Sequence, residues 1–350
     1  MPRISKASSA DFLAFSIVFF IILSIVFLMP IQPNDYWWFM RVAQETLRNG
    51  AFPAQELISF TQAGAPVTYQ FWLAGMGLYA AHQVGGALTT ALLRGILVAG
   101  LYFFVWLACR RAGAGAGLAS LLTLLAALAG SNNWAMRPQD YGYPLFGLIL
   151  WALWRWGEGE NRSLWALPLA SVLWVNLHGS FVLLFALAGA ALVFGKGDRR
   201  QLAIALAFAL LASLANPQGA LVWRTVFQMT GDASIQQFSK EWLPPVNSGW
   251  QMNLFFGWLL AFVVFAGLSS RRLNVLHTVW FLGLGWLALT GLRYGIWFGG
   301  LLAVLSAYLL APLAQRWFTR RILNTAKAFN LVLGSVLLLS PIFFLPGIRE

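Results

Sequence analysis

The sequence predicts an all-α polytopic membrane protein with about eleven transmembrane helices. Hydrophobic residues make up 59% of the 350 residues and charged residues only 10%, and apolar runs of membrane-spanning length recur along the whole chain. The basic residues, which give a net charge of +12, stand in short clusters between these runs. Such clusters orient a chain in the membrane, so membrane lipid is expected as a partner and nucleic acid is not.

We predict a single transmembrane domain over residues 1–350. The first apolar run, 12–29, is too long for a signal peptide and no cleavage site follows it, so we expect it to stay on the chain as a span. The other predicted spans are 90–109, 116–132, 141–156, 164–177, 180–195, 201–215, 253–269, 275–291, 294–312 and 328–345. A further run, 69–84, is short and carries Trp72 and Tyr79 like interfacial anchors. It is predicted to lie on the membrane surface as a helix.

With 69–84 on the surface, the basic clusters between the spans all fall on one side of the membrane. They hold 15 of the 23 lysines and arginines: Arg3, Lys6, Arg110, Arg111, Arg155, Arg162, Lys196, Arg199, Arg200, Arg271, Arg272, Arg316, Arg320, Arg321 and Lys327. The positive-inside rule assigns this side, and the N-terminus with it, to the cytoplasm.

The opposite side has two long loops, about 30–88 and 216–252. Carboxylates and single arginines gather there, although the orientation of the chain does not need them. We therefore predict that the functional site lies on the extracytoplasmic face.

Two carboxylates of the first loop are candidates for chemistry. Asp35 follows the first span and precedes Tyr36, Trp37 and Trp38, so it could act as a base or cap the helix that begins near Tyr36. Glu56 follows Pro53 and could contact a substrate or a metal, or cap a turn.

Arg137 and Arg293 are the candidate cations, because each stands alone at an extracytoplasmic span end. An arginine fork suits two phosphate oxygens, whereas the alternatives are snorkelling to lipid headgroups or pairing with a carboxylate such as Asp140. Arg94 lies about one turn inside the second span. It is predicted to snorkel outward or to bind a lipid phosphate.

The turn that holds Asn176 and His178 is predicted to shape a pocket through hydrogen bonds. A metal site there is not predicted, because the other two histidines lie elsewhere and no Cys/His spacing pattern exists. Cys109 lies inside an apolar run and is expected to pack in the core. The chain also lacks the glycine-rich nucleotide motifs, so no cofactor is predicted.

Several short segments together resemble the GT-C class of membrane glycosyltransferases, in a largely uncharacterised bacterial branch. They are Asp35-Tyr36-Trp37-Trp38, Met136-Arg137-Pro138-Gln139, Trp174 to Phe181, and Leu292-Arg293-Tyr294. In this class the first extracytoplasmic loop begins with an acidic residue and contains two juxtamembrane helices, the second of which would be 69–84. The resemblance covers most of the chain and implies a protein of the bacterial inner membrane.

The resemblance implies transfer of a hexosyl or pentosyl group from a polyprenyl-phosphate-linked donor to an extracytoplasmic acceptor. Asp35 would be the base, and Arg293 and Arg137 would hold the donor phosphate. The further substrate contacts would be Trp37, Trp38, Glu56, His178 and Asn176. Relatives often carry an acidic residue where this chain has Gln70-Phe71-Trp72, so a divalent metal is possible but is not predicted.

Two other classes of function fit the sequence. A transporter or lipid flippase would also be polytopic and basic, but should show inverted repeats and broken helices near the middle of the membrane. The chain could also be a non-catalytic accessory subunit, because it lacks the acidic residue that relatives often carry near Phe71. Many GT-C relatives continue into a soluble domain after the last span, and we expect the loops to select the acceptor here.

Overall fold

The computed structural model is helical throughout its described part, which comprises residues 8–32, 35–67, 69–231, 239–317 and 327–346. Within this part, strand-like pairing is confined to an isolated bridge between Gln55 and Pro66. The predicted cytoplasmic residues Arg3, Lys6, Arg320 and Arg321 and the side chain of Arg316 lie outside the described residues. The predicted all-α class is thus confirmed.

Every predicted span coincides with a helix. The helices are α1 (Ser9–Leu28), α3 (Trp72–Arg111), α4 (Ala116–Gly130), α5 (Pro138–Gly157), α6 (Ala166–Leu177), α7 (Val182–Phe194), α8 (Arg199–Ala212), α11 (Gly249–Leu268), α12 (Val275–Thr290), α13 (Gly295–Trp317) and α14 (Lys327–Leu339). Six helical segments of the described chain are long and apolar enough to cross a membrane: those that contain α1, α3, α4, α11, α13 and α14. The other five are shorter or, in α5, begin with polar residues, so crossing by all eleven stays a prediction.

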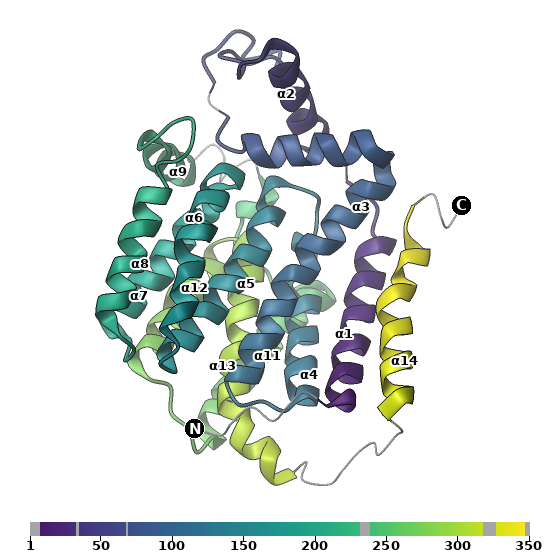
Figure 1. The fold of residues 1–350 in the computed structure, drawn as a ribbon, viewed down its shortest axis with the longest axis vertical. Coiled ribbons are helices and arrows are strands. Elements are labelled where there is room, and N and C mark those ends of the chain that lie inside the picture. The colour runs from purple at the N-terminus through teal and green to yellow at the C-terminus, as the bar shows by residue number, and fades with distance from the viewer. Residues whose placement is uncertain (1–7, 33–34, 68, 232–238, 318–326, 347–350) are drawn as a thin grey trace.

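The helices stand side by side in one bundle, with α2 (Tyr36–Asn49) above it and α1 next to α14 (Figure 1). Large apolar side chains point outward along the bundle; Leu260, Trp286 and Leu339 are each at least 70% exposed. Exposure of so many large apolar side chains is unfavourable in water and favourable in contact with lipid. The chain is an integral membrane protein.

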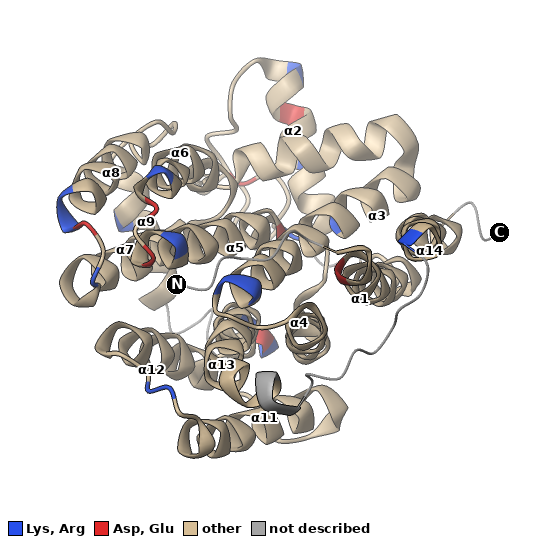
Figure 2. Ribbon diagram, turned by 60° about the horizontal axis from the view of Figure 1, so that its bottom comes forward, with Lys and Arg blue, Asp and Glu red and all other residues tan. Residues whose placement is uncertain are grey.

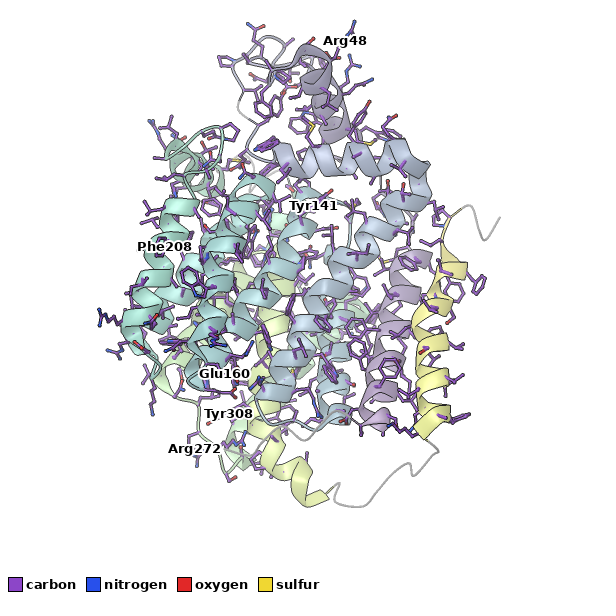
Figure 3. The ribbon with its side chains drawn as sticks, viewed as in Figure 1. Arg48, Tyr141, Glu160, Phe208, Arg272 and Tyr308 are labelled. Atoms are coloured by element: carbon purple, nitrogen blue, oxygen red, sulfur yellow. The ribbon has the colours of Figure 1, made fainter. Side chains whose placement is uncertain are left out.

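The two ends of the bundle differ in their residues. Arg48 of α2 marks one end, and Arg272, Glu160 and Tyr308 gather near the other (Figure 3). We call these the α2 end and the Arg272 end. Viewed from the Arg272 end, lysines and arginines occupy the helix termini and the loops between them (Figure 2). The predicted cytoplasmic clusters of the described chain lie here.

Helix α3 bends sharply at Gly85 and Gly86, so that its first arm runs across the top of the bundle and its second arm descends through it (Figure 1). Gly86 has φ +58° and ψ −132°, a conformation that residues with a Cβ rarely adopt. The Thr89 hydroxyl donates to the carbonyl of Ala81, and the Thr90 hydroxyl to that of Gly86 at 2.9 Å, which satisfies acceptors freed by the bend. The first arm, which begins at Trp72, corresponds to the predicted surface helix 69–84. Its position on a membrane surface stays a prediction.

Helices α3 and α5 approach closely at two glycines. A Cβ on Gly100 would lie 2.8 Å from the Cβ of Pro144, and a Cβ on Gly147 would lie 2.9 Å from the Leu101 carbonyl oxygen. Small residues at a helix interface allow backbones in a membrane to pack tightly. This contact fixes the start of α5, and with it Arg137, relative to α3.

The connections at the α2 end contain the short elements that form the candidate site. They are η1 (Ser131–Asn133), η3 (Gly179–Phe181), α9 (Leu221–Gly231), η4 (Lys240–Trp242) and η5 (Leu292–Tyr294). At the opposite end lies η2 (Asn161–Trp165), and η6 (Ser340–Phe344) follows α14. Polar connections thus carry the site, while the apolar helices hold them in place.

Candidate active site

Arg137 and Arg293 converge on the carboxylate of Glu241. Nη1 of Arg137 binds Oε2 of Glu241, and Nη1 of Arg293 binds Oε1 at 3.1 Å. The three residues come from distant parts of the chain, because Arg137 directly precedes α5, Arg293 lies in η5 and Glu241 in η4. The fold therefore forms a site where two guanidinium groups hold one oxyanion between them.

The guanidinium of Arg293 is fixed by further contacts. Its Nη2 donates to Oε1 of Gln139 at 3.1 Å, and Nε2 of Gln139 donates to the Arg293 carbonyl at 3.2 Å. The guanidinium also lies over the ring of Trp242, 4.4 Å from its centroid. With 15% of its side chain exposed, Arg293 is held in place before any ligand binds.

Asp35 is a second carboxylate near Arg137. Its Oδ2 is 3.9 Å from Nε of Arg137, and 48% of its side chain is exposed. Asp35 occupies the N-cap position of α2, but its side chain makes no capping hydrogen bond. The Asp35 side chain therefore does not cap α2, which was the alternative role predicted from the sequence. Its carboxylate is partly exposed and lies beside Arg137.

Two cavities meet at this cluster. The Arg137 cavity, of about 440 Å³, is lined by the end of α1, by η1 and by Arg137, Asp140 and Glu241. The Arg293 cavity, of about 420 Å³, is lined by Arg293, His178, Trp242 and apolar side chains of α7, α9 and α12. Gln139 lines both cavities. One arginine thus faces each cavity, and Glu241 joins the two arginines.

The other predicted residues of the first loop lie outside these cavities. Trp37 and Trp38 are 58% and 40% exposed, and Trp37 packs edge to face with His82. Oε1 of Glu56 accepts from the backbone N–H groups of Ile58 and Ser59 at 2.8 and 3.0 Å. Glu56 thus caps a turn, which is the alternative that the sequence left open, and a substrate contact stays a prediction.

His178 lines the Arg293 cavity in the turn between α6 and η3. Its Nδ1 accepts from the backbone N–H of Ser180 at 3.1 Å, so the neutral ring carries its proton on Nε2. Burial, and to a smaller extent the charge of Arg293, hold the pKa of His178 well below its usual range. The ring stacks on Phe71 with centroids 5.2 Å apart. A neutral donor therefore stands beside the phosphate-binding candidate Arg293.

Asn176 has a different place from His178. Its Oδ1 accepts from Nε1 of Trp72 at 2.8 Å, and its Nδ2 donates to the carbonyls of Val172 and Ala215. Asn176 lines neither cavity. Its amide ties the start of α3 to α6, so we assign it a positioning role.

The structure assigns roles to Glu241, Gln139 and Trp242 that were not predicted from the sequence. The sequence does place Glu241 in the second extracytoplasmic loop, the part of the chain where unneeded charges gather. It cannot show that this carboxylate reaches residues 104 and 52 positions away. Within the described residues, no group of three His, Cys, Asp or Glu side chains is placed to hold a metal ion.

The prediction for Arg94 is wrong. Its side chain is only 1% exposed, and it donates to the carbonyls of Val26, Met29 and Pro30 at 2.6, 2.6 and 3.1 Å. It neither snorkels nor faces lipid, because the end of α1 exposes carbonyls that only a buried donor can satisfy. Arg94 therefore fixes the exit of α1, from which Asp35 follows.

We expect Arg94→Leu to destabilise the protein by about 3–5 kcal/mol, because it leaves three carbonyls without their charged donor and removes the positive charge that interacts with buried Asp140. Chemical unfolding in detergent measures this loss. Ile96→Ala, on the exposed face of the same helix, is the matched control and should change stability by about 0.5 kcal/mol or less. Equal stability of Arg94→Leu and wild type would contradict the role given to Arg94.

Comparison with proteins of known structure supports the fold. The chain is similar to the Archaeoglobus fulgidus oligosaccharyltransferase AglB in complex with an inhibitory peptide and a dolichol-phosphate (TM-score 0.61, 12% identity, 96% of this chain and 55% of that one). It is also similar to the A. fulgidus enzyme tethered to an acceptor peptide (0.63, 14%, 97% and 55%) and to its apo form (0.62, 12%, 98% and 56%).

No protein-family model and no curated protein sequence matches the chain. The chain spans a little over half the length of the oligosaccharyltransferases that it matches, and at 12–14% identity the likeness is one of fold. These neighbours belong to the GT-C class that the sequence resembles. The chain therefore has the fold of a GT-C membrane glycosyltransferase.

Proposed function

We propose that the protein transfers a sugar from a polyprenyl-phosphate-linked donor to an acceptor on the α2 side of the membrane. The observation that carries this proposal is the convergence of Arg137 and Arg293 on the two oxygens of Glu241. Two arginines arranged around an oxyanion match the oxygens of a phosphate, and arginine forks bind phosphate strongly. The likeness to an enzyme whose structure holds a dolichol-phosphate supports a lipid phosphate as ligand.

The two cavities suggest how a donor would lie. The Arg293 cavity has apolar walls that include Leu183, Val226 and Leu287, so it suits the isoprenoid chain next to the phosphate. The Arg137 cavity has polar walls and lies nearer Asp35, so it suits the sugar and the acceptor. The donor phosphate would bridge the cavities at the position where the arginines bind Glu241.

In the proposed reaction, the acceptor nucleophile attacks the anomeric carbon of the sugar. The bond between this carbon and the phosphate oxygen breaks, and the electron pair leaves with the phosphate. Arg137 and Arg293 stabilise the charge that develops on the phosphate, and Asp35 takes the proton of the nucleophile. The polyprenyl phosphate is then released, and Glu241 binds the two arginines again.

Transfer of a labelled sugar in proteoliposomes tests the proposed function. The wild-type protein and a polyprenyl-phosphate-linked sugar are reconstituted together, and label on an acceptor is measured. Transfer is expected from the wild type and equally from Arg48→Gln, which removes an exposed arginine of α2 far from the cluster. Absence of transfer from any such donor would contradict the proposal, and donor that crosses the bilayer intact would indicate a flippase.

A further inference from the structure

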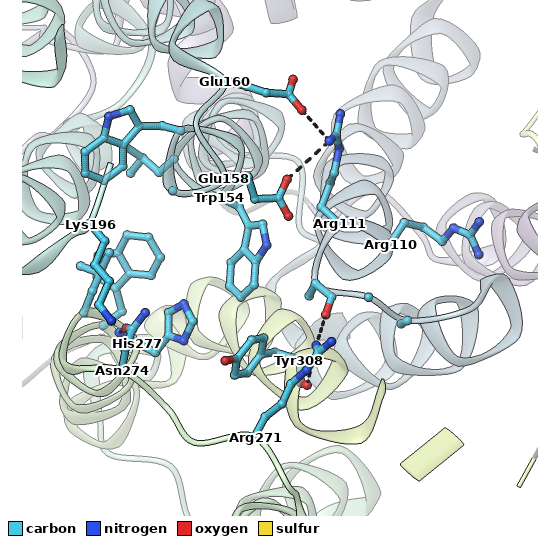
Figure 4. Close-up of a pocket in the computed structure, with 18 of the residues that line it drawn as sticks. Arg110, Arg111, Trp154, Glu158, Glu160, Lys196, Arg271, Asn274, His277 and Tyr308 are labelled. Atoms are coloured by element: carbon cyan, nitrogen blue, oxygen red, sulfur yellow. Dashed lines mark hydrogen bonds and ion pairs between the residues drawn. The ribbon is translucent and has the colours of Figure 1, made fainter. Parts of the chain in front are cut away.

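A third cavity lies at the Arg272 end, on the other side of the bundle from the candidate active site. This Arg271 cavity, of about 830 Å³, is larger than either cavity at the α2 end. The ends of α3 and α5, the loop that carries Lys196, and the start of α12 surround it (Figure 4). None of its lining residues takes part in the proposed transfer.

The cations of this cavity differ in whether a carboxylate neutralises them. Arg111 binds Glu158 at 3.4 Å and Glu160 at 2.6 Å, and Arg110 points away toward Asp11. Lys196 and Arg271 also line the cavity, and the described part of the chain supplies neither with an ion-pair partner. The positive charges of Lys196 and Arg271 therefore remain unpaired with any carboxylate of the described residues.

The guanidinium of Arg271 is held by contacts of Nη1 and by a tyrosine ring, while Nη2 makes no hydrogen bond within the described residues. Its Nη1 donates to the carbonyls of Ala112 and Tyr308 at 2.7 and 3.2 Å, and its guanidinium lies 4.9 Å from the centroid of the Tyr308 ring. Gly113, at φ +102°, brings the loop past this group, since a Cβ there would lie 3.2 Å from Nη1. Nη2 has no hydrogen-bond partner among the described residues, so it is available to a ligand.

The start of α12 adds a second set of donors. Oδ1 of Asn274 caps the N–H of His277 at 2.8 Å, and the helix carries partial positive charge at this end. The His277 side chain lines the cavity, is 8% exposed and stacks on Trp154 with centroids 4.9 Å apart. Its Nδ1 is buried and has no hydrogen-bond partner in the described chain. Most buried polar atoms in proteins have a hydrogen-bond partner, so the unpaired Nδ1 favours a ligand in this cavity.

We propose that the Arg271 cavity binds a phosphate group, with Lys196 and Arg271 as its charged donors and the α12 N-terminus with His277 as its neutral ones. A phosphate offers several acceptor oxygens, which suits donors that approach from three elements at once. Lipid headgroups and soluble phosphates share this chemistry. If the basic loops face the cytoplasm as predicted, the ligand comes from that side, opposite the site of transfer.

The test follows the thermal unfolding midpoint of the full-length protein, because a ligand that binds the folded state raises it. In one arm, inorganic phosphate is titrated in detergent at constant ionic strength. In the other, nanodiscs of phosphatidylcholine are compared with and without phosphatidic acid. All variants carry Arg137→Gln and Arg293→Gln, so that the candidate active site lacks both of its proposed phosphate-binding arginines.

We expect a saturable rise of the midpoint in at least one arm, and that arm identifies a soluble phosphate or a lipid headgroup as the source. Lys196→Gln should weaken the binding about 10- to 100-fold, since it removes a charged donor. The matched control Arg200→Gln removes an exposed positive charge from the same end and should leave the binding unchanged. No saturable rise in either arm, or equal weakening by both substitutions, would overturn the proposal.

Discussion

Asp35→Asn should lower the rate of sugar transfer by about 10²–10⁴-fold, the range that general base catalysis contributes. The amide keeps the shape of the side chain but cannot take the proton of the acceptor. The structure supports this role because the carboxylate of Asp35 is half exposed, is not used as a helix cap and lies 3.9 Å from Arg137. The measurement is kcat in proteoliposomes, together with the affinity for the donor.

The control for this prediction is Glu45→Gln on the same helix. Glu45 binds Arg41 at 2.7 Å between successive turns of α2, and such i,i+4 pairs on one helix contribute little to stability. This variant should transfer sugar at the wild-type rate. Donor affinity should change little in Asp35→Asn, because the phosphate is bound by other residues. Full activity of Asp35→Asn would exclude Asp35 as the base.

Arg293→Gln should lower transfer by about 10²–10³-fold, which is the usual cost of removing one donor to the charge that develops in a transition state. Because Arg293 also binds the ground-state phosphate in the proposed mechanism, donor affinity should fall as well. Arg293→Lys should rescue only part of the activity. A lysine keeps the charge but cannot bind Glu241, Gln139 and the phosphate in the geometry of a planar fork.

Comparing the chemical unfolding of Arg293→Gln and Arg94→Leu separates an effect on sugar transfer from an effect on stability. In Arg293→Gln the carboxylate of Glu241 keeps Arg137 as a partner, so this variant should lose less stability than Arg94→Leu. Arg94 makes its contacts at the buried end of α1, so its loss should lower stability. If Arg293→Gln loses as much stability as Arg94→Leu while donor affinity is unchanged, the assigned role of Arg293 in phosphate binding is wrong.

The helical fold could be predicted from the sequence because long apolar runs alternate with short basic clusters. Apolar runs mark the helices, and the positions of the basic clusters predict that 69–84 does not cross the membrane. In the structure, α3 bends at Gly85 and Gly86, and its first arm runs across the bundle. A glycine pair alone does not predict such a bend, since glycines are also common in straight membrane helices.

The site could be predicted only in part. Arg137 and Arg293 are recognisable because orientation of the chain does not need them, and the structure brings them together on one carboxylate. Glu241 was missed because its role depends on a contact between distant loops. Arg94 was misassigned because the sequence shows its depth in the helix but not the α1 carbonyls that it meets.

In the proposed mechanism, the arginine pair that binds Glu241 here holds the phosphate of a lipid donor. The most direct measurement is a structure of the protein with a bound polyprenyl phosphate in a lipid nanodisc. We predict the phosphate between Arg137 and Arg293, the isoprenoid chain in the Arg293 cavity, and Glu241 displaced from both guanidinium groups. A phosphate bound elsewhere, with both arginines still on Glu241, would contradict the account.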